Sequence, residues 1–288
     1  MLPLQIDNLK KHYGASVGVE DVTLNVKEGE IFGFIGPNGA GKSTTIRALL
    51  GFLKPTSGNV NVLEKCCFNQ GDLTRDEIGY VPADMGYYGH MTARQFLTYA
   101  ANLKERGHDR IKELSDRLEL NLAVKIGKMS TGNKKKVGII CAVMSTPKVL
   151  IFDEPTAGLD PIMQQVFFDI VTEEKKRGCA ILLSSHNLTE VQKICDRVGI
   201  IKRGKVISIE SVEALRQKQL KNVMFTTEHT KPELNLAGIK NLVVKEKTYS
   251  FKYVGEMTDL VNLLSTLDLI NLSITDTDLD TMFLHYYS

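Results

Sequence analysis

The sequence lacks a hydrophobic run long enough to cross a bilayer. Its longest apolar stretches, such as Val137 to Met144, are far shorter than the roughly 20 residues that a membrane-spanning helix needs. The start of the chain also lacks the basic-then-apolar order of a secretory signal, because Asp7 and the pair Lys10-Lys11 come too early. We therefore expect a cytosolic protein that touches a membrane only through another molecule.

An excess of charge of one sign and a cysteine framework are also missing. The 36 basic and 34 acidic residues give a net charge of +2, which is too small an imbalance to indicate nucleic acid or acidic lipid as a partner. The five cysteines form no CxxC pair and no metal-ligand spacing, which fits reduced thiols. With 288 residues, 43% of them hydrophobic, we expect one large domain, or one with a small companion, around a sizeable core.

A glycine-rich loop is the most informative motif that is present. It reads Gly36-Pro37-Asn38-Gly39-Ala40-Gly41-Lys42-Ser43-Thr44, which fits the pattern GxxxxGK[ST]. An apolar strand, 31–35, precedes it, and a helix that ends near Gly51 follows. We expect its three glycines to adopt positive φ, so that backbone N–H groups and the helix N-terminus face phosphates. Lys42 would reach the β- and γ-phosphates and Ser43 would ligate Mg²⁺, so the loop predicts a nucleoside triphosphate site.

Two acidic residues follow a second strand. Residues 149–152 form a continuous apolar run, which is typical of a strand buried on both faces of a parallel sheet, and Asp153 and Glu154 come next. Proteins of the α/β class bind ligands at this end of their strands. Asp153 would hold Mg²⁺, and Glu154 would orient or deprotonate the water that attacks the γ-phosphate. The simpler interpretation, a helix N-cap by Asp153, fits less well because Pro155 follows.

Two further side chains are candidates from their positions alone. His186 follows the buried strand 181–184 and should point to the same sheet edge as Glu154, although a lone histidine is usually structural. Tyr13 lies in the loop between the expected strands 4–6 and 22–26, where its ring would either pack or stack on a nucleotide base. The residues themselves favour packing for Tyr13.

The rest of the chain predicts two domains. Residues 92–126 have a helical pattern that begins with a capping box, so a helical insert should interrupt the α/β part. Asp160-Pro161 should open a helix, and Arg203-Gly204 should turn a hairpin. The last part predicts strands 223–225, 242–244, 249–253 and 272–274 and helices 257–267 and 278–287. We expect a nucleotide-binding domain over 1–210, with a helical subdomain over about 86–146, and a small α/β accessory domain over 211–288.

The chain resembles the ATP-binding subunit of an ATP-binding cassette (ABC) transporter, because the phosphate loop, the pair Asp153-Glu154 and His186 follow one another in the order typical of that family. The resemblance covers residues 4 to about 210. Residues 129–137 stand where that family has its LSGGQ signature and the following helix, residues 157–160 match the loop after the catalytic glutamate, and Ser185-His186 matches the switch histidine. The resemblance implies a P-loop NTPase fold with a mainly parallel core sheet, and an adenine-stacking role for Tyr13.

The resemblance also implies a mechanism and partners. The protein should be a Mg-dependent ATPase that works as a head-to-tail dimer, with ATP bound between the phosphate loop of one subunit and Ser130–Gly132 of the other. Lys42, Glu154 and His186 should be catalytic, and ATP and Mg²⁺ the cofactors. The C-terminal part is similar to subunits of bacterial drug, bacteriocin and lantibiotic exporters. The expected partners are a separate transmembrane permease and a second ATP-binding subunit, a copy of this chain, on the inner face of the cell membrane.

The sequence departs from the family at two motifs. A glutamine of the family that contacts Mg²⁺ and water is replaced by Ala83, so either the next residue, Asp84, takes its place or the link between nucleotide and permease differs. The signature has Thr131 for its first glycine and Asn133 for its glutamine. We expect the basic run 134–136 to be a solvated helix face and not a contact for nucleic acid.

Two other functional classes compete with this interpretation. The first is a soluble ABC-type ATPase that acts on ribosomes or DNA, but such proteins usually have two cassettes or a long coiled-coil insert, and this chain has one phosphate loop. The second is a GTP-binding switch, which needs an NKxD motif. The stretch Asn133-Lys134-Lys135-Lys136 lacks the aspartate.

Overall fold

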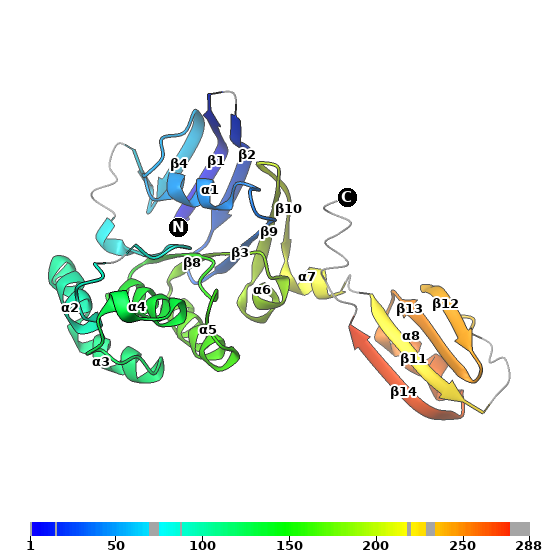
Figure 1. The fold of residues 1–288 in the computed structure, drawn as a ribbon. Coiled ribbons are helices and arrows are strands. Elements are labelled where there is room, and N and C mark those ends of the chain that lie inside the picture. Colours follow the sequence, from blue (N-terminus) through cyan, green and yellow to red (C-terminus); the bar gives the residue numbers. More distant parts are fainter. Residues whose placement is uncertain are drawn as a thin grey trace. The chain divides into compact units, whose positions relative to one another are not determined.

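The fold is taken from a computed structural model, in which residues 2–14, 16–68, 75–86, 88–217, 220–228 and 234–276 are described. The chain divides into two compact units, Met1–Val212 and Glu213–Ser288, and each is treated by itself (Figure 1). Across the described ranges, no helix is both long enough and apolar enough to span a membrane.

The first unit contains both strands and helices. Its strands are β1 (Leu4–Tyr13), β2 (Ser16–Val26), β3 (Ile31–Ile35), β4 (Ser57–Val62), β5 (Lys65–Cys66), β6 (Ile78–Val81), β7 (Val149–Asp153), β8 (Ala180–Ser185), β9 (Arg197–Lys202) and β10 (Lys205–Ser211). Its α-helices are α1 (Lys42–Leu49), α2 (Ala93–Lys104), α3 (His108–Arg117), α4 (Thr131–Val143), α5 (Pro161–Lys176) and α6 (Leu188–Ile194). Short 3₁₀ turns lie at Arg75–Glu77 and Ile126–Lys128.

The strands form one sheet in the order β5-β4-β1-β2-β10-β9-β3-β8-β7-β6. The run β9-β3-β8-β7-β6 is parallel, and β5, β4, β1 and β2 are antiparallel. Every residue of β3, β7 and β8 is buried, as expected for strands covered on both faces. The carboxyl ends of these three strands therefore lie at one edge, where the phosphate loop, Asp153-Glu154 and His186 follow them.

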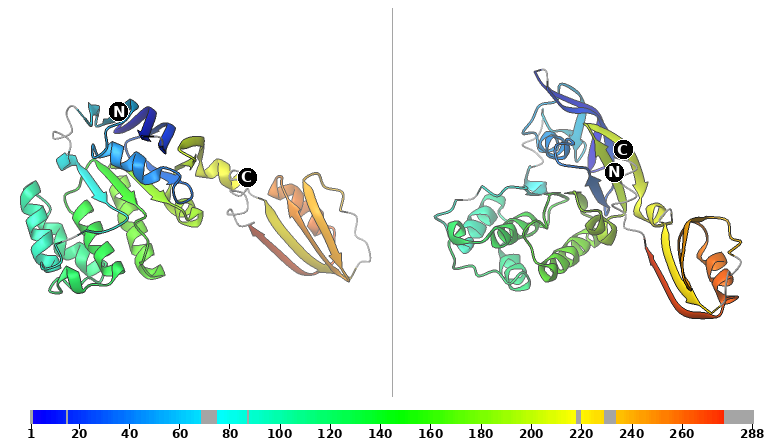
Figure 2. Two further views of the ribbon diagram at one scale, coloured as in Figure 1. Left: turned by 45° about the horizontal axis from the view of Figure 1, so that its top comes forward. Right: turned by 45° about the vertical axis from the view of Figure 1, so that its right-hand side comes forward.

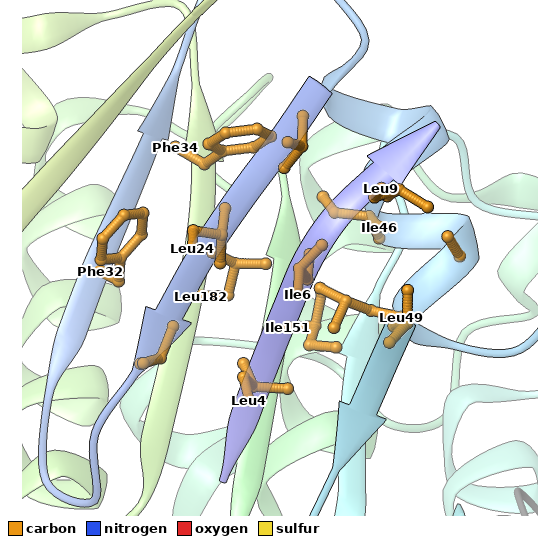
Figure 3. Packing of buried hydrophobic residues seen from close by; sticks show 14 of the residues in the cluster. Leu4, Ile6, Leu9, Leu24, Phe32, Phe34, Ile46, Leu49, Ile151 and Leu182 are labelled. Carbon is orange, nitrogen blue, oxygen red and sulfur yellow. The ribbon is translucent and has the colours of Figure 1, made fainter. Parts of the chain in front are cut away.

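Buried apolar side chains hold helix α1 in place. Its Ile46 and Leu49 pack beside Ile6 and Leu9 of β1 and Ile151 of β7, and all five are fully or almost fully buried (Figure 3). Burial of each such side chain contributes about 1.5–3 kcal/mol. The helix whose N-terminus ends the phosphate loop is thus held between the antiparallel strands and the parallel sheet.

The start of the chain differs from the sequence prediction. Instead of short strands at 4–6 and 22–26, β1 and β2 form a long hairpin, and Tyr13 is the last residue of β1, paired with Ser16, so it does not lie in a loop. The register of this pair shifts three times, and Asn8 has a φ of 49°. These irregularities break the period of two that would have revealed the strands from the sequence.

The helical segment and the predicted helix starts agree with the sequence signals. Thr92 and Gln95 form the capping box at the start of α2, and the Asp160 side chain accepts from Met163 N at the start of α5, with Pro161 in the first turn. Helices α2, α3 and α4 lie together in both views of Figure 2. The predicted hairpin around Arg203-Gly204 is also present, as β9 and β10.

The second unit is an antiparallel sheet with one helix that packs on it. Its elements are β11 (Lys221–Thr227), β12 (Ile239–Lys245), β13 (Thr248–Tyr253), α8 (Met257–Ser265) and β14 (Leu269–Asp276), with the sheet order β12-β13-β11-β14. The short helix α7 (Val212–Gln217) begins at the last residue of the first unit and continues into the second. Phe225, Tyr249 and Phe251 form its aromatic centre beside Leu260 and Leu264 of α8. The predicted final helix, 278–287, lies outside the described residues.

Candidate nucleotide-binding and catalytic site

The phosphate loop begins where β3 ends and leads directly into α1. Gly39 and Gly41 have φ values of 79° and 113°, in the region that favours glycine. Gly41 is the N-cap of α1, and no side chain caps the helix. The N-terminal N–H groups and the helix dipole therefore offer a site for an anion. The expectation of positive φ was wrong for Gly36, which is glycine because a Cβ there would stand 2.5 Å from the Ile201 carbonyl oxygen.

Lys42 is held inside the loop that it follows. Its side chain is only 7% exposed, and its Nζ donates to the carbonyl oxygens of Gly36 at 2.6 Å and Pro37 at 3.4 Å. The same Nζ lies 3.6 Å from Glu154 Oε1. The structure thus brings together a lysine and a carboxylate that the sequence separates by more than a hundred residues.

Glu154 occupies a constrained backbone position just past β7. Its φ is 51°, which costs a non-glycine residue about 1–3 kcal/mol and persists only where neighbours enforce it. Its backbone N–H donates to the carbonyl and hydroxyl oxygens of Ser184, both at 3.2 Å. Its Oε2 lies 2.8 Å from Nδ1 of His186, an imidazole that is 64% exposed. The carboxylate is therefore fixed between Lys42 on one side and His186 on the other.

Asp153 is the last residue of β7 and is 3% exposed. Its Oδ1 accepts a 2.6 Å hydrogen bond from Ser184 Oγ. Burial, and then the charge of Asp153, raise the pKa of Tyr80 on β6 to about 12. A buried carboxylate is costly to desolvate, so this one favours a cation nearby.

Lys42 and Glu154 border a cavity of about 350 Å³. It is lined by Val17, Gly18, Pro37, Asn38, Gly39, Gly41, Lys42, Ser43, Thr44, Ala83 and Glu154. Gly36 and Ala40 of the phosphate loop do not line it, and neither does Asp153. A larger cavity, of about 550 Å³, shares no residue with this one. The smaller cavity is the candidate site, because it combines the anion-binding loop with the two reactive side chains.

Tyr13 packs against Gly18, one of the residues that line this cavity. The contact is so close that a Cβ at Gly18 would stand 2.6 Å from Tyr13 Cε2. Tyr13 is 48% exposed, and Lys11 Nζ lies 5.3 Å from the centroid of its ring. A half-exposed aromatic side chain beside a residue that lines the cavity is suited to stacking, so the position fits a base-stacking role.

The two signature residues lie elsewhere. Ser130 caps α4 by accepting from Asn133 N, and a Cβ on Gly132 would stand 2.4 Å from the Gly158 carbonyl oxygen. Neither lines the cavity of its own subunit. The signature loop thus rests on the loop after Glu154 and not on this chain's own phosphate loop.

The structure also corrects the expectation for the basic run 134–136 and adds one residue to the site. Lys135 and Lys136 are 1% and 8% exposed, so the basic run is not a solvated face, because α4 turns these lysines toward the protein interior. Ser184, which bonds both Asp153 and Glu154, was missed. A signal existed, because Ser184 ends the apolar run of β8 beside β7, in register with Asp153.

Comparisons with known proteins agree with this site. The model of the ABC transporter family matches residues 19–157. The bacitracin transport ATP-binding protein BcrA of Bacillus licheniformis is 37% identical over 228 residues, which are 77% of this chain and 74% of that protein. A solved ATP-binding subunit of an ABC transporter superposes with a TM-score of 0.71 at 31% identity, covering 75% of this chain and 92% of the other.

A dimeric ATP-binding cassette in a post-hydrolysis state, bound to ADP and Pi, superposes with a TM-score of 0.67 at 25% identity and covers 73% of this chain and 98% of that one. The expected fold, that of a P-loop NTPase of the ABC type, is confirmed by these superpositions. Sequence, fold and the arrangement of Lys42 and Glu154 lead to the same conclusion: the chain belongs to the ABC transporter family, as an ATP-binding subunit with the ATPase fold.

Proposed function

We propose that this chain hydrolyses ATP to drive a membrane exporter whose permease is a separate chain. The contact of Glu154 with both Lys42 and His186 at the end of the phosphate-loop cavity is the observation that carries the ATPase role. The export role draws on the bacitracin transport protein among its relatives. The protein would lie on the cytoplasmic face of the membrane, attached through the permease.

The residues of the cavity suit ATP hydrolysis. Backbone N–H groups of the phosphate loop would bind the phosphates, and Lys42 would exchange its carbonyl partners for phosphate oxygens. Glu154 would accept a proton from the attacking water, and His186, now bonded to Glu154, would contact the γ-phosphate. Tyr13 would stack on the adenine.

Mg²⁺ fits the side chains present. No group of three or more His, Cys, Asp or Glu side chains that could hold a metal is found among the described residues. Mg²⁺ commonly uses one or two protein oxygens and completes its shell with phosphate oxygens and water. Asp153 and Ser43 would supply those protein oxygens. The ion would neutralise charge on the phosphates.

The reaction would take place in a head-to-tail dimer. Ser130 and Gly132 do not line the phosphate-loop cavity of their own chain, and they stand at the N-terminus of α4, where N–H groups can bind an anion. In a dimer they would close the cavity of the second subunit. ATP would favour the closed dimer because it contacts both halves, and hydrolysis would remove that preference.

The test is affinity purification of tagged Glu154→Gln protein from detergent-solubilised native membranes, with and without Mg-ATP. The substitution should trap the ATP-bound dimer on its permease, since binding groups remain and the proton acceptor is lost. Lys42→Ala, which should fail to bind the phosphates, is the matched control. We expect a polytopic membrane protein that is enriched with Glu154→Gln in Mg-ATP and not with the control.

Recovery of ribosomes or DNA instead would favour a soluble ABC-type ATPase and would remove the export role. Recovery of the tagged protein alone would contradict a stable permease complex. A permease that is recovered can be co-expressed with the chain, and the ATPase rate of the complex in nanodiscs then measures coupling.

A further inference from the structure

Lys135 occupies an unusual place for a lysine. It lies on α4, five residues after the signature Ser130, and only 1% of it is exposed. Its Nζ donates to two successive backbone carbonyls, those of Pro82 at 3.0 Å and Ala83 at 2.9 Å. Burial of a lysine is costly unless its ammonium is satisfied, so these two contacts indicate a specific role.

The acceptors belong to the segment that lines the nucleotide cavity. Ala83 is one of the lining residues, together with Lys42 and Glu154. It stands where a glutamine side chain was expected to contact Mg²⁺ and water, and its methyl group can do neither. What fixes this part of the cavity is therefore the backbone of residues 82–83, and Lys135 holds both of its carbonyl oxygens.

Nearby carboxylates favour the charged form of the Lys135 side chain. Burial lowers the pKa of Lys135, and the charges of Asp153, Asp84 and Glu154 oppose that change. These are the carboxylates of the sheet edge and of the segment after Ala83. The positive charge of Lys135 is thus favoured by the three carboxylates of this part of the molecule.

Helix α4 packs closely on β6, the strand that leads into residues 82–83. A Cβ at Gly79 of β6 would stand 2.2 Å from the carbonyl oxygen of Ala142, so glycine allows α4 to lie directly on the strand that leads into residues 82–83. At its other end, α4 carries Gly132 against Gly158. A displacement of the signature loop would therefore be passed to the cavity of the same subunit through Lys135.

We infer that Lys135 is a positioning residue for ATP hydrolysis, which holds the Pro82–Ala83 backbone at the nucleotide cavity and links it to the signature helix that serves the second subunit. The inference rests on the proposed head-to-tail dimer. It makes Lys135 the link between the two ATP sites in a chain without the glutamine side chain.

The test compares Lys135→Met, Lys135→Gln and Lys135→Arg with Lys112→Met, which removes an exposed lysine of α3. Lys135→Met should lower kcat about tenfold or more, because small displacements of a catalytic cavity are this costly. It should leave the ATP affinity of the monomer within about twofold, because the phosphate loop is untouched. Lys135→Arg, which keeps the charge and the donors, should recover part of the rate, and Lys112→Met should behave as wild type.

The dependence of the rate on ATP concentration separates linkage from simple loss of fold. The Hill coefficient of Lys135→Met should fall toward about 1, since the two sites no longer influence each other. Melting temperature and nucleotide binding, measured on each variant, report folding. If Lys135→Met does not fold, the order of rates Arg above Gln carries the test, and equal rates of wild type, Arg and Gln variants would overturn the inference.

Failure of the inference and failure of the proposed function give different results. A folded Lys135→Met with wild-type kcat and Hill coefficient overturns the role of Lys135 alone. A wild-type protein without Mg-ATP turnover, or a Glu154→Gln variant that forms no ATP-dependent dimer in size-exclusion chromatography, overturns the proposed function and the inference with it.

Discussion

At the scale of single residues, Glu154 is the most constrained side chain of the site. Its backbone has a positive φ, and its N–H donates to two oxygens of Ser184. Its carboxylate contacts both Lys42 and His186, which fix it at the cavity. Such pre-positioning lowers the cost of reaching the reactive geometry. The residue is therefore placed to act on a water and has little freedom for another role.

The first prediction concerns this carboxylate. Glu154→Gln should lower the ATPase rate by at least about a hundredfold, because the amide cannot accept the proton of the attacking water. ATP binding should remain, since the phosphate loop is unchanged, and dimer formation should increase with ATP. Single-turnover hydrolysis and equilibrium nucleotide binding check both parts. An active Glu154→Gln protein would contradict the catalytic assignment.

The second prediction concerns the signature glycine. Gly132→Ala should displace the start of α4 from Gly158, because its Cβ would lie 2.4 Å from a carbonyl oxygen. We expect a loss of about 1–3 kcal/mol in the free energy of unfolding and a lower ATPase rate, with ATP binding to the monomer retained.

Gly86→Ala is the matched control for this glycine, because a Cβ at Gly86 has no neighbour within 4 Å. Urea unfolding and ATPase assays of the two variants make the comparison. Equal stability of both variants would show that the contact between Gly132 and Gly158 does not hold in solution.

At the scale of elements, two arginines of α3 join the helical segment to α5. Arg110 is 2.7 Å from Glu174, which is 1% exposed, and Arg117 contacts both carboxylate oxygens of Glu173 at 2.7 and 2.8 Å. Paired donors on a planar guanidinium restrict geometry as well as distance. The two contacts oppose rotation of α3 against α5.

The third prediction follows from the pKa of Glu173. The hydrogen bond from Arg117 lowers this pKa below its usual value of 4.5. A lowered folded-state pKa stabilises the protein above the unfolded pKa, and this stabilisation is lost as the pH falls. Glu173 is 42% exposed, so solvent screens the pair and the effect should be below about 1 kcal/mol.

The measurement is urea unfolding of wild type and Glu173→Gln at pH 7 and pH 3. We expect wild type to be the more stable at pH 7 and the difference to be smaller at pH 3, because the stabilisation decreases as the pH falls below the unfolded-state pKa. A difference that is the same at both values would show that the charge of Glu173 does not contribute.

Sequence motifs made of neighbouring residues predicted some elements correctly. Burial that depends on segments far apart in the sequence was predicted poorly. The phosphate loop and the start of α5 at Asp160-Pro161 were predicted because a glycine pattern and a cap depend on neighbours in sequence. The interior position of Lys135 was not predicted from the sequence, because it depends on how β6 and residues 82–83 pack on α4. The long hairpin of β1 and β2 was underestimated because its register shifts conceal the strand pattern.

At the scale of the whole molecule, the chain consists of two units with separate cores. The core of the first includes Ile46 and Ile151, and the core of the second is built on Phe225 and Tyr249. Each unit therefore buries its own apolar surface, which is the condition for independent folding. The residues of the nucleotide cavity all belong to the first unit.

The fourth prediction is that a chain ending after Gln217 folds and binds ATP. The cut retains α7, because this helix begins at Val212, the last residue of the first unit. The melting temperature should stay within about 5 °C of that of the first transition in the whole chain, and ATP affinity should be unchanged. Thermal melting with and without nucleotide checks this. Loss of binding on truncation would show that the second unit supports the cavity.

The position of β3 in the sheet has a consequence for synthesis of the chain. Its two neighbours are β8 and β9, which lie about 150 residues later in sequence, so the strand that carries the phosphate loop leaves the ribosome long before its scaffold. At roughly 5–20 residues per second, the delay is on the order of 10–30 s. During that interval nascent chains should be dependent on chaperones, and ATP should begin to act as a folding ligand only after β9 has emerged.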